Sequence, residues 1–105
     1  MLENWELTMH LYNLIALHSF ALEHADSRVP LAAWQLEAEE AEWAGPKQVR
    51  ERYTNAVVSP NRIVFSLAGV CKLDVKAKFE KGILLIEKVW ADARASKSLA
   101  GRAKK

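Results

Sequence analysis

The sequence is short of several residue types, and each shortage excludes a class of protein. Its 105 residues include one cysteine, three prolines and four glycines. The lone cysteine, Cys71, excludes an internal disulfide and is typical of a reducing compartment, which predicts a cytoplasmic protein. The longest apolar run, Leu14 to Ala21, is interrupted by His18 and Ser19 and is too short to span a bilayer. We therefore expect no membrane partner.

Patterns for metals and cofactors are also missing. His10, His18 and His24 do not have metal-ligand spacing with Cys71. The sequence contains no glycine-rich phosphate loop and no serine-histidine-aspartate arrangement. We expect neither a metal nor a cofactor, and Cys71 is predicted to be an inert core residue.

Charge is unevenly distributed, although the net charge is only +2. Acidic residues crowd the segment from Glu37 to Glu42, whereas basic residues dominate from Lys88 to the end of the chain. Binding of an anionic partner depends on this local distribution of charge more than on the net charge. The acidic segment is also explained as an exposed helix face, and the basic end as a solvated chain terminus.

Helical spacing dominates the first half of the chain. Apolar residues between Leu11 and Ala25 recur on one face and predict a helix packed into the core, which Asp26-Ser27 ends. Pro30 suits the first turn of a second helix, which Gly45-Pro46 stops. These two segments predict a helical hairpin. A third, short helix is expected from Pro46 through Arg52.

The period then changes to that of strands. After a predicted loop from Asn55 to Asn61, the segment Arg62 to Leu67 reads as a strand. From Cys71 to Phe79 apolar residues alternate with charged ones, which predicts one buried and one polar face. A third antiparallel strand is expected from Ile83 to Trp90. Helices followed by strands indicate an α+β domain whose antiparallel sheet is covered on one side.

One set of residues runs through several of these elements in a fixed order. It reads Pro30-Leu31-x-x-Trp34-x-x-Glu37, then Ala41-x-Trp43-x-x-Pro46-x-x-Val49-x-x-x-Tyr53, then Arg62-x-Val64-Phe65. This order resembles the HigB family of bacterial toxins, members of the RelE-like group, and the resemblance covers Met9 to Val89. It implies a small domain over residues 9–90, with a helical hairpin packed on an antiparallel sheet of three to four strands. Residues 1–8 are then an N-terminal extension and residues 91–105 a basic C-terminal tail.

The resemblance also implies a function. Family members are messenger-RNA endoribonucleases that act in the ribosome and are held inactive by a cognate helix-turn-helix antitoxin. Such cleavage uses the ribose 2′-hydroxyl as nucleophile and needs cations and a proton donor or acceptor around the phosphate. By their matched positions, the candidate catalytic residues are Lys72, Lys76 and Asp92. The candidate RNA-binding residues are Arg62, Lys47, Arg50, Arg52, Lys88 and Arg94.

The closing strand departs from the family pattern. Where the family has I-R-F-x-G-T-H-x-E-Y-D, this chain reads Ile86-Glu87-Lys88-Val89-Trp90-Ala91-Asp92-Ala93-Arg94-Ala95-Ser96. Glu87 replaces an arginine, Asp92 a histidine and Ala95 a tyrosine. A carboxylate beside the scissile phosphate repels it unless protonated or screened. Two hypotheses follow: an active site rebuilt from other residues, or a non-catalytic toxin-like scaffold that binds antitoxin or RNA.

Overall fold

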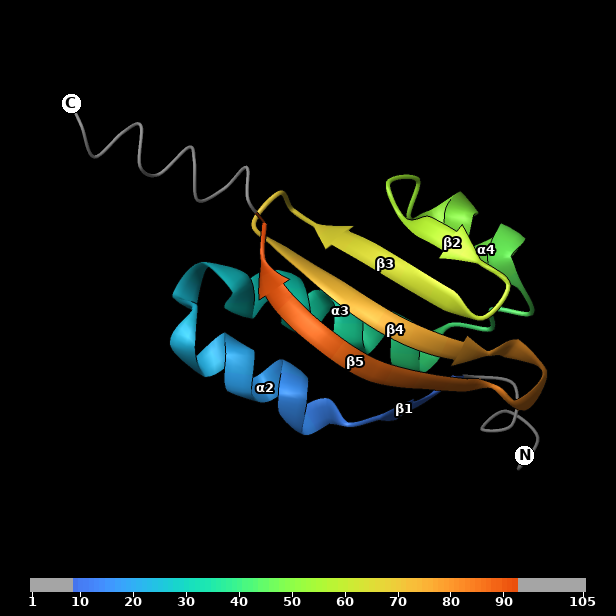
Figure 1. The fold of residues 1–105 in the computed structure, drawn as a ribbon, viewed down its shortest axis with the longest axis horizontal. Coiled ribbons are helices and arrows are strands. Elements are labelled where there is room, and N and C mark those ends of the chain that lie inside the picture. The colour runs from blue at the N-terminus through green and yellow to red at the C-terminus, as the bar shows by residue number, and fades with distance from the viewer. Residues whose placement is uncertain (1–8, 93–105) are drawn as a thin grey trace.

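The computed structural model describes residues 9–92 as a layer of helices on one face of a β-sheet (Figure 1). In chain order the elements are β1 His10–Tyr12, α2 Leu14–Glu23, the 3-10 turn η1 Ala25–Ser27, α3 Arg28–Glu40, α4 Pro46–Arg52, β2 Val57–Ser59, β3 Arg62–Leu67, β4 Cys71–Lys78, the 3-10 turn η2 Phe79–Lys81, and β5 Ile83–Ala91. The predicted extension at residues 1–8, and residues 93–105 of the predicted tail 91–105, lie outside the described residues. The first residue of that tail, Ala91, is instead the last residue of β5, and Asp92 is buried. Within residues 9–92, no helix is both long and apolar enough to cross a membrane.

The sheet confirms the predicted α+β class but has more strands than expected. Its five strands lie in the order β1-β5-β4-β3-β2, and β1 runs parallel to β5 while the other pairs are antiparallel. The expectation of three to four strands, all antiparallel, therefore needs correction. β1 and β2 are three residues long, too short to show an alternating pattern in the sequence. β2 lies inside the predicted loop and pairs tightly with β3, with Ser59 opposite Arg62.

The helical hairpin forms as predicted, with shifted bounds. α2 begins at Leu14 rather than Leu11 because β1 and the left-handed residue Asn13, with φ 67°, precede it. The Asn13 side-chain amide donates a hydrogen bond of 2.9 Å to the Ile86 carbonyl, which ties the helix start to β5. At the other end of α2, Arg28 Nε donates a 2.8 Å hydrogen bond to the Ala21 carbonyl. A guanidinium at this end also complements the helix dipole.

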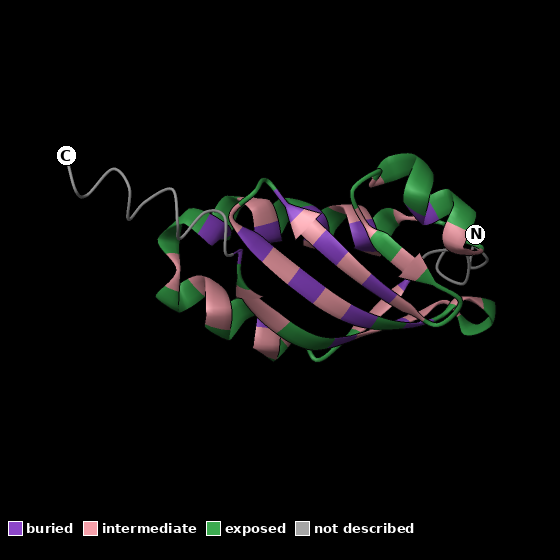
Figure 2. Ribbon diagram, turned by 45° about the horizontal axis from the view of Figure 1, so that its top comes forward, coloured by how far each residue is buried: buried purple, intermediate pink, exposed green. Residues whose placement is uncertain are grey.

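β4 is the central strand, and its alternation decides which face is buried. Leu73 and Val75 are fully buried against the helices, whereas Lys76 and Lys78 on the other face are exposed. Figure 2 shows this pattern as buried and less buried bands along the strands. The predicted alternation is confirmed as far as Ala77. Phe79 lies beyond the strand, in η2, and is only half-buried.

Four aromatic residues form the part of the core beneath α4. Phe65 on β3 has its ring centroid 5.3 Å from that of Trp34, 6.0 Å from that of Trp43 and 5.1 Å from that of Tyr53. Trp34 and Phe65 are fully buried, so each contributes about 1.5–3 kcal/mol or more through burial alone. Trp34, Trp43 and Phe65 are buried and Tyr53 is half-buried, so these rings pack mainly against one another.

A polar network fastens α4 to α3 at the edge of this cluster. The Tyr53 hydroxyl donates a hydrogen bond to the Glu37 carboxylate, and Arg52 forms an ion pair with the same carboxylate. The Arg52 guanidinium carbon also lies 5.0 Å from the centroid of the Tyr53 ring. Burial, followed by the hydrogen bond to Glu37, raises the pKa of Tyr53 well above its ordinary value of 10.0.

Substituting Tyr53 tests this network through the pH dependence of stability. The folded-state pKa of Tyr53 is raised, so above about pH 10 the unfolded chain ionises first and stability falls. We expect Tyr53→Phe to lower the free energy of unfolding by about 1–2 kcal/mol at pH 7, because a hydrogen bond to a carboxylate is lost. It should also lose less stability than the parent above pH 10. Urea unfolding at both pH values measures this, and equal alkaline losses in the two proteins would contradict it.

Candidate functional site

The face of the sheet opposite α2 and α3 carries four of the candidate residues, namely Arg62, Lys72, Lys76 and Lys88. Strand alternation places Arg62, Val64 and Ser66 of β3, Lys72, Asp74, Lys76 and Lys78 of β4, and Ile83, Leu85, Lys88 and Trp90 of β5 on this face. A β-bulge between the pairs Asp74↔Lys88 and Val75↔Ile86 adds Glu87, so that Glu87 and Lys88 are both exposed. We call this surface the open face.

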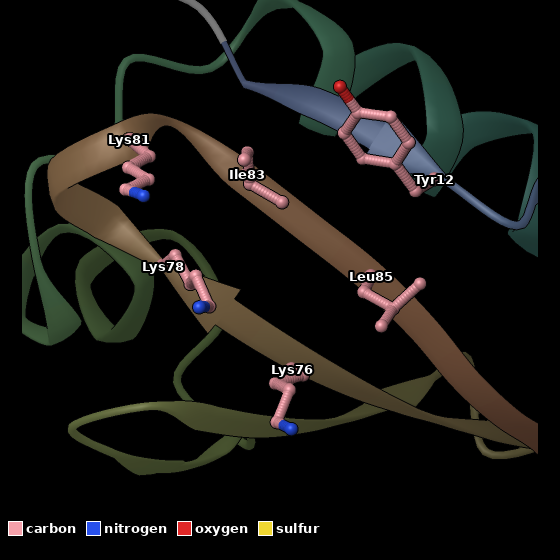
Figure 3. Close-up of a pocket in the computed structure, with 6 residues that line it drawn as sticks. All are labelled: Tyr12, Lys76, Lys78, Lys81, Ile83 and Leu85. Atoms are coloured by element: carbon pink, nitrogen blue, oxygen red, sulfur yellow. The ribbon is translucent and has the colours of Figure 1, made fainter.

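A groove lies at the β1 end of the open face. Its volume is about 360 Å³, and it is lined by Tyr12, Lys76, Lys78, Lys81, Ile83 and Leu85. Figure 3 shows Tyr12 projecting from β1 beside the aliphatic side chains of β5, with Lys76 and Lys78 across from it on β4. Tyr12 is 52% exposed. Within residues 9–92 none of the three lysines forms an ion pair, so their charges are available to an anion.

The centre of the open face is an ion-paired cluster. Arg62 donates to the Asp74 carboxylate at 2.8 Å and lies 3.7 Å from the Glu87 carboxylate. The pair Arg62↔Lys76 is directly cross-strand, so this cluster adjoins the groove. The structure thus brings the candidates Arg62 and Lys76 together on neighbouring strands, and it places Lys72 on the same face, four positions away along β4. Two carboxylates, however, already satisfy the Arg62 charge.

The far end of the open face carries Lys72, Lys88 and Trp90. Lys72 is paired across the strands with Trp90, and Lys88 Nζ lies 5.8 Å from the centroid of the Trp90 ring. All three side chains are at least partly exposed. This end is therefore basic, like the groove, with one aromatic ring among its lysines.

The candidates on α4 lie at the opposite edge of the sheet from the groove, next to β2. Lys47 and Arg50 are exposed on this helix. Arg52 is ion-paired with Glu37, and its charge is therefore largely neutralised. The structure does not gather these three residues with Lys72 and Lys76. Arg94 lies outside the described residues.

Asp92 is placed away from the open face. It is 2% exposed, its backbone amide donates a 2.9 Å hydrogen bond to the Val70 carbonyl, and its charge contributes to raising the pKa of Cys71. Burial is the main cause of that raised pKa, and Cys71 belongs to the core side of β4. Asp92 thus faces the core side, whereas Lys72 and Lys76 face the opposite side. The structure does not bring it to the other two catalytic candidates.

Of the six groove residues, only Lys76 is predicted from the sequence as a site residue. Sequence reasoning missed the aliphatic Ile83 and Leu85 and the three polar or aromatic residues Tyr12, Lys78 and Lys81. Lys78 lies two positions after Lys76 in β4, so strand alternation already predicted that it projects from the same polar face. Tyr12 gave no signal, because β1 reaches the groove only through its parallel pairing with β5, where Tyr12 lies opposite Leu85. Lys81 belongs to the η2 turn, and it lines the groove only because of the path that this turn takes.

Comparison with known proteins identifies the family. The model of the HigB toxin family, described as the RelE-like toxic component of a toxin-antitoxin system, matches residues 27–93, which is more than half of the chain. The match runs from the start of α3 through β5 and so includes the whole lysine-bearing part of the sheet. No curated protein sequence matches the chain. The resemblance inferred from the sequence motifs is thereby confirmed, and the chain belongs to the HigB family of RelE-like toxins.

Proposed function

We propose that this toxin binds and cleaves messenger RNA in the ribosome through the open face of its sheet. The groove carries the proposal: three lysines without ion pairs among residues 9–92 line an apolar strip that ends in an exposed tyrosine ring. Proteins that bind single-stranded nucleic acid combine such charges, which contact phosphates, with aromatic rings on which bases stack. The partner in the cytoplasm would be a helix-turn-helix antitoxin.

The proposed reaction is a transfer of the phosphate to the neighbouring ribose oxygen. The 2′-oxygen forms a bond to phosphorus, the bond from phosphorus to the 5′-oxygen breaks, and a 2′,3′-cyclic phosphate and a 5′-hydroxyl result. Lys72 and Lys76 stabilise the negative charge that develops on the phosphate. A base must take the 2′-proton, and an ammonium such as that of Lys76 can donate a proton to the departing oxygen.

Glu87 is the base that the open face offers. It is exposed on the bulge of β5 and lies 3.7 Å from Arg62, which offsets the repulsion between its carboxylate and a phosphate. Asp92 is buried on the other side of the sheet, so we leave it out of the reacting groups and propose that it holds the end of β5. The site is then a rebuilt one, in which a glutamate stands where the family pattern has an arginine.

A second function, binding without cleavage, is favoured by the same central cluster. Asp74 and Glu87 both contact Arg62, so the centre of the open face is less positive than its two ends. A phosphate would be held there more weakly than beside Lys72 or Lys78. In this alternative the chain binds RNA or antitoxin but does not accelerate RNA cleavage.

RNA affinity tests the open face directly. Each phosphate contact to a single strand contributes about −0.7 to the slope of log affinity against log salt. The double variant Lys76→Ala, Lys78→Ala should bind oligouridylate more weakly and reduce the slope by roughly 1.4. Lys47→Ala removes one charge from α4, distant from the groove, and should have a smaller effect on both quantities. A slope untouched by the double variant would remove the groove from the proposal.

Cleavage separates the two functions. We expect messenger-RNA cleavage in a translating extract and growth arrest in cells, both abolished or strongly reduced by Lys72→Ala. Glu87→Gln should lower the cleavage rate by about 10²- to 10⁴-fold, the usual cost of losing a general base, without weakening RNA binding. Glu80→Gln is the matched control: it neutralises an exposed carboxylate in η2 and should leave the cleavage rate unchanged. A parent protein that binds RNA and antitoxin but cleaves no message would establish the non-catalytic function.

A further inference from the structure

Trp90 differs from the other tryptophans that the structure describes. Trp34 and Trp43 belong to the core, with exposures of 0% and 7%. Trp90 lies on the open face, is only half-buried, and stands between two lysines, Lys72 across the strands and Lys88 along β5. Core packing therefore does not account for this ring.

The contact between Lys88 and Trp90 is loose. Its distance of 5.8 Å from Nζ to the ring centroid is near the limit of about 6 Å for a cation–π interaction. At an exposed site such a contact is weak, so a nucleobase can displace the ammonium from the ring. The displaced Lys88 and the neighbouring Lys72 then lie beside the ring, where the flanking phosphates of a stacked nucleotide would be.

The Trp90 end is separate from the groove. Tyr12 pairs with Leu85 of β5, and Trp90 is five positions further along that strand. At about 3.3 Å per residue, the two rings are separated by roughly 15 Å. The Arg62 cluster lies between them, where Asp74 is opposite Lys88. One RNA strand of a few nucleotides would therefore reach both ends and cross the centre.

We infer that Trp90, Lys72 and Lys88 form a second nucleotide subsite, in which a base of single-stranded RNA stacks on the Trp90 ring and the lysines bind its flanking phosphates. This inference rests on the proposed RNA-binding function and deepens it. The open face then has two aromatic rings on which bases stack, Tyr12 on one side of the Arg62 cluster and Trp90 on the other. The two rings fix which phosphate lies beside Glu87, so Trp90 is a positioning residue for cleavage.

Binding of fluorescein-labelled oligouridylate, measured by anisotropy, tests the subsite. Trp90→Ala should weaken binding by roughly 5- to 150-fold, the range for losing one base–aromatic stack. Trp90→Phe keeps an aromatic face and should retain most of the affinity, which separates stacking from loss of the fold. Ile15→Ala, which shortens a side chain 72% exposed on α2, should leave binding unchanged.

Tryptophan emission provides a second readout that a structural role would not change. Unlabelled oligouridylate should quench part of the emission in the parent, and this quenching should disappear in Trp90→Phe although that variant still binds. Unchanged affinity in Trp90→Ala, together with weaker binding in the Lys76→Ala, Lys78→Ala variant, would overturn the second subsite and leave the proposed function intact. A parent that does not bind oligouridylate would overturn both.

Discussion

The burial of one side of β4 is the constraint on which the rest of the molecule depends. Leu73 and Val75 must pack against the helices, and a shift of register by one residue would turn their charged neighbours into the core. Because the helices cover only that side, the lysines of β4 are left together on the open face. The basic surface is thus a direct consequence of how the core forms.

Much of this arrangement could be predicted from the sequence. The alternation in β4, the strand Arg62–Leu67 and the helix Pro46–Arg52 carry strong local patterns, and the structure confirms all three. The pairing of β1 and of β2 could not be predicted, because three residues show no period and each strand forms only by pairing with another, β1 with the distant β5 and β2 with the following β3. The same pairing brings Tyr12 to the groove, which explains why the candidate site was incomplete.

Side-chain pairing decides which predicted cations can serve a ligand. Sequence position alone does not show which of Arg52, Arg62 and Lys76 is ion-paired in the folded chain. In the structure Arg52 forms an ion pair with Glu37. Arg62 forms ion pairs with Asp74 and Glu87. Lys76 forms no ion pair among residues 9–92. The burial of Asp92 depends on the end of β5 and likewise has no signal in the local sequence. The open face consequently has two basic ends around a neutralised centre.

The central claim is that RNA lies across the open face and not on the helices. Photo-crosslinking with an oligonucleotide that contains 4-thiouridine, followed by mass spectrometry of the crosslinked peptides, tests it most directly. The account predicts crosslinks in peptides from β4 and β5, at Trp90 or its neighbours and around Ile83, and at Tyr12. Crosslinks confined to the exposed surfaces of α2 and α3 would contradict it.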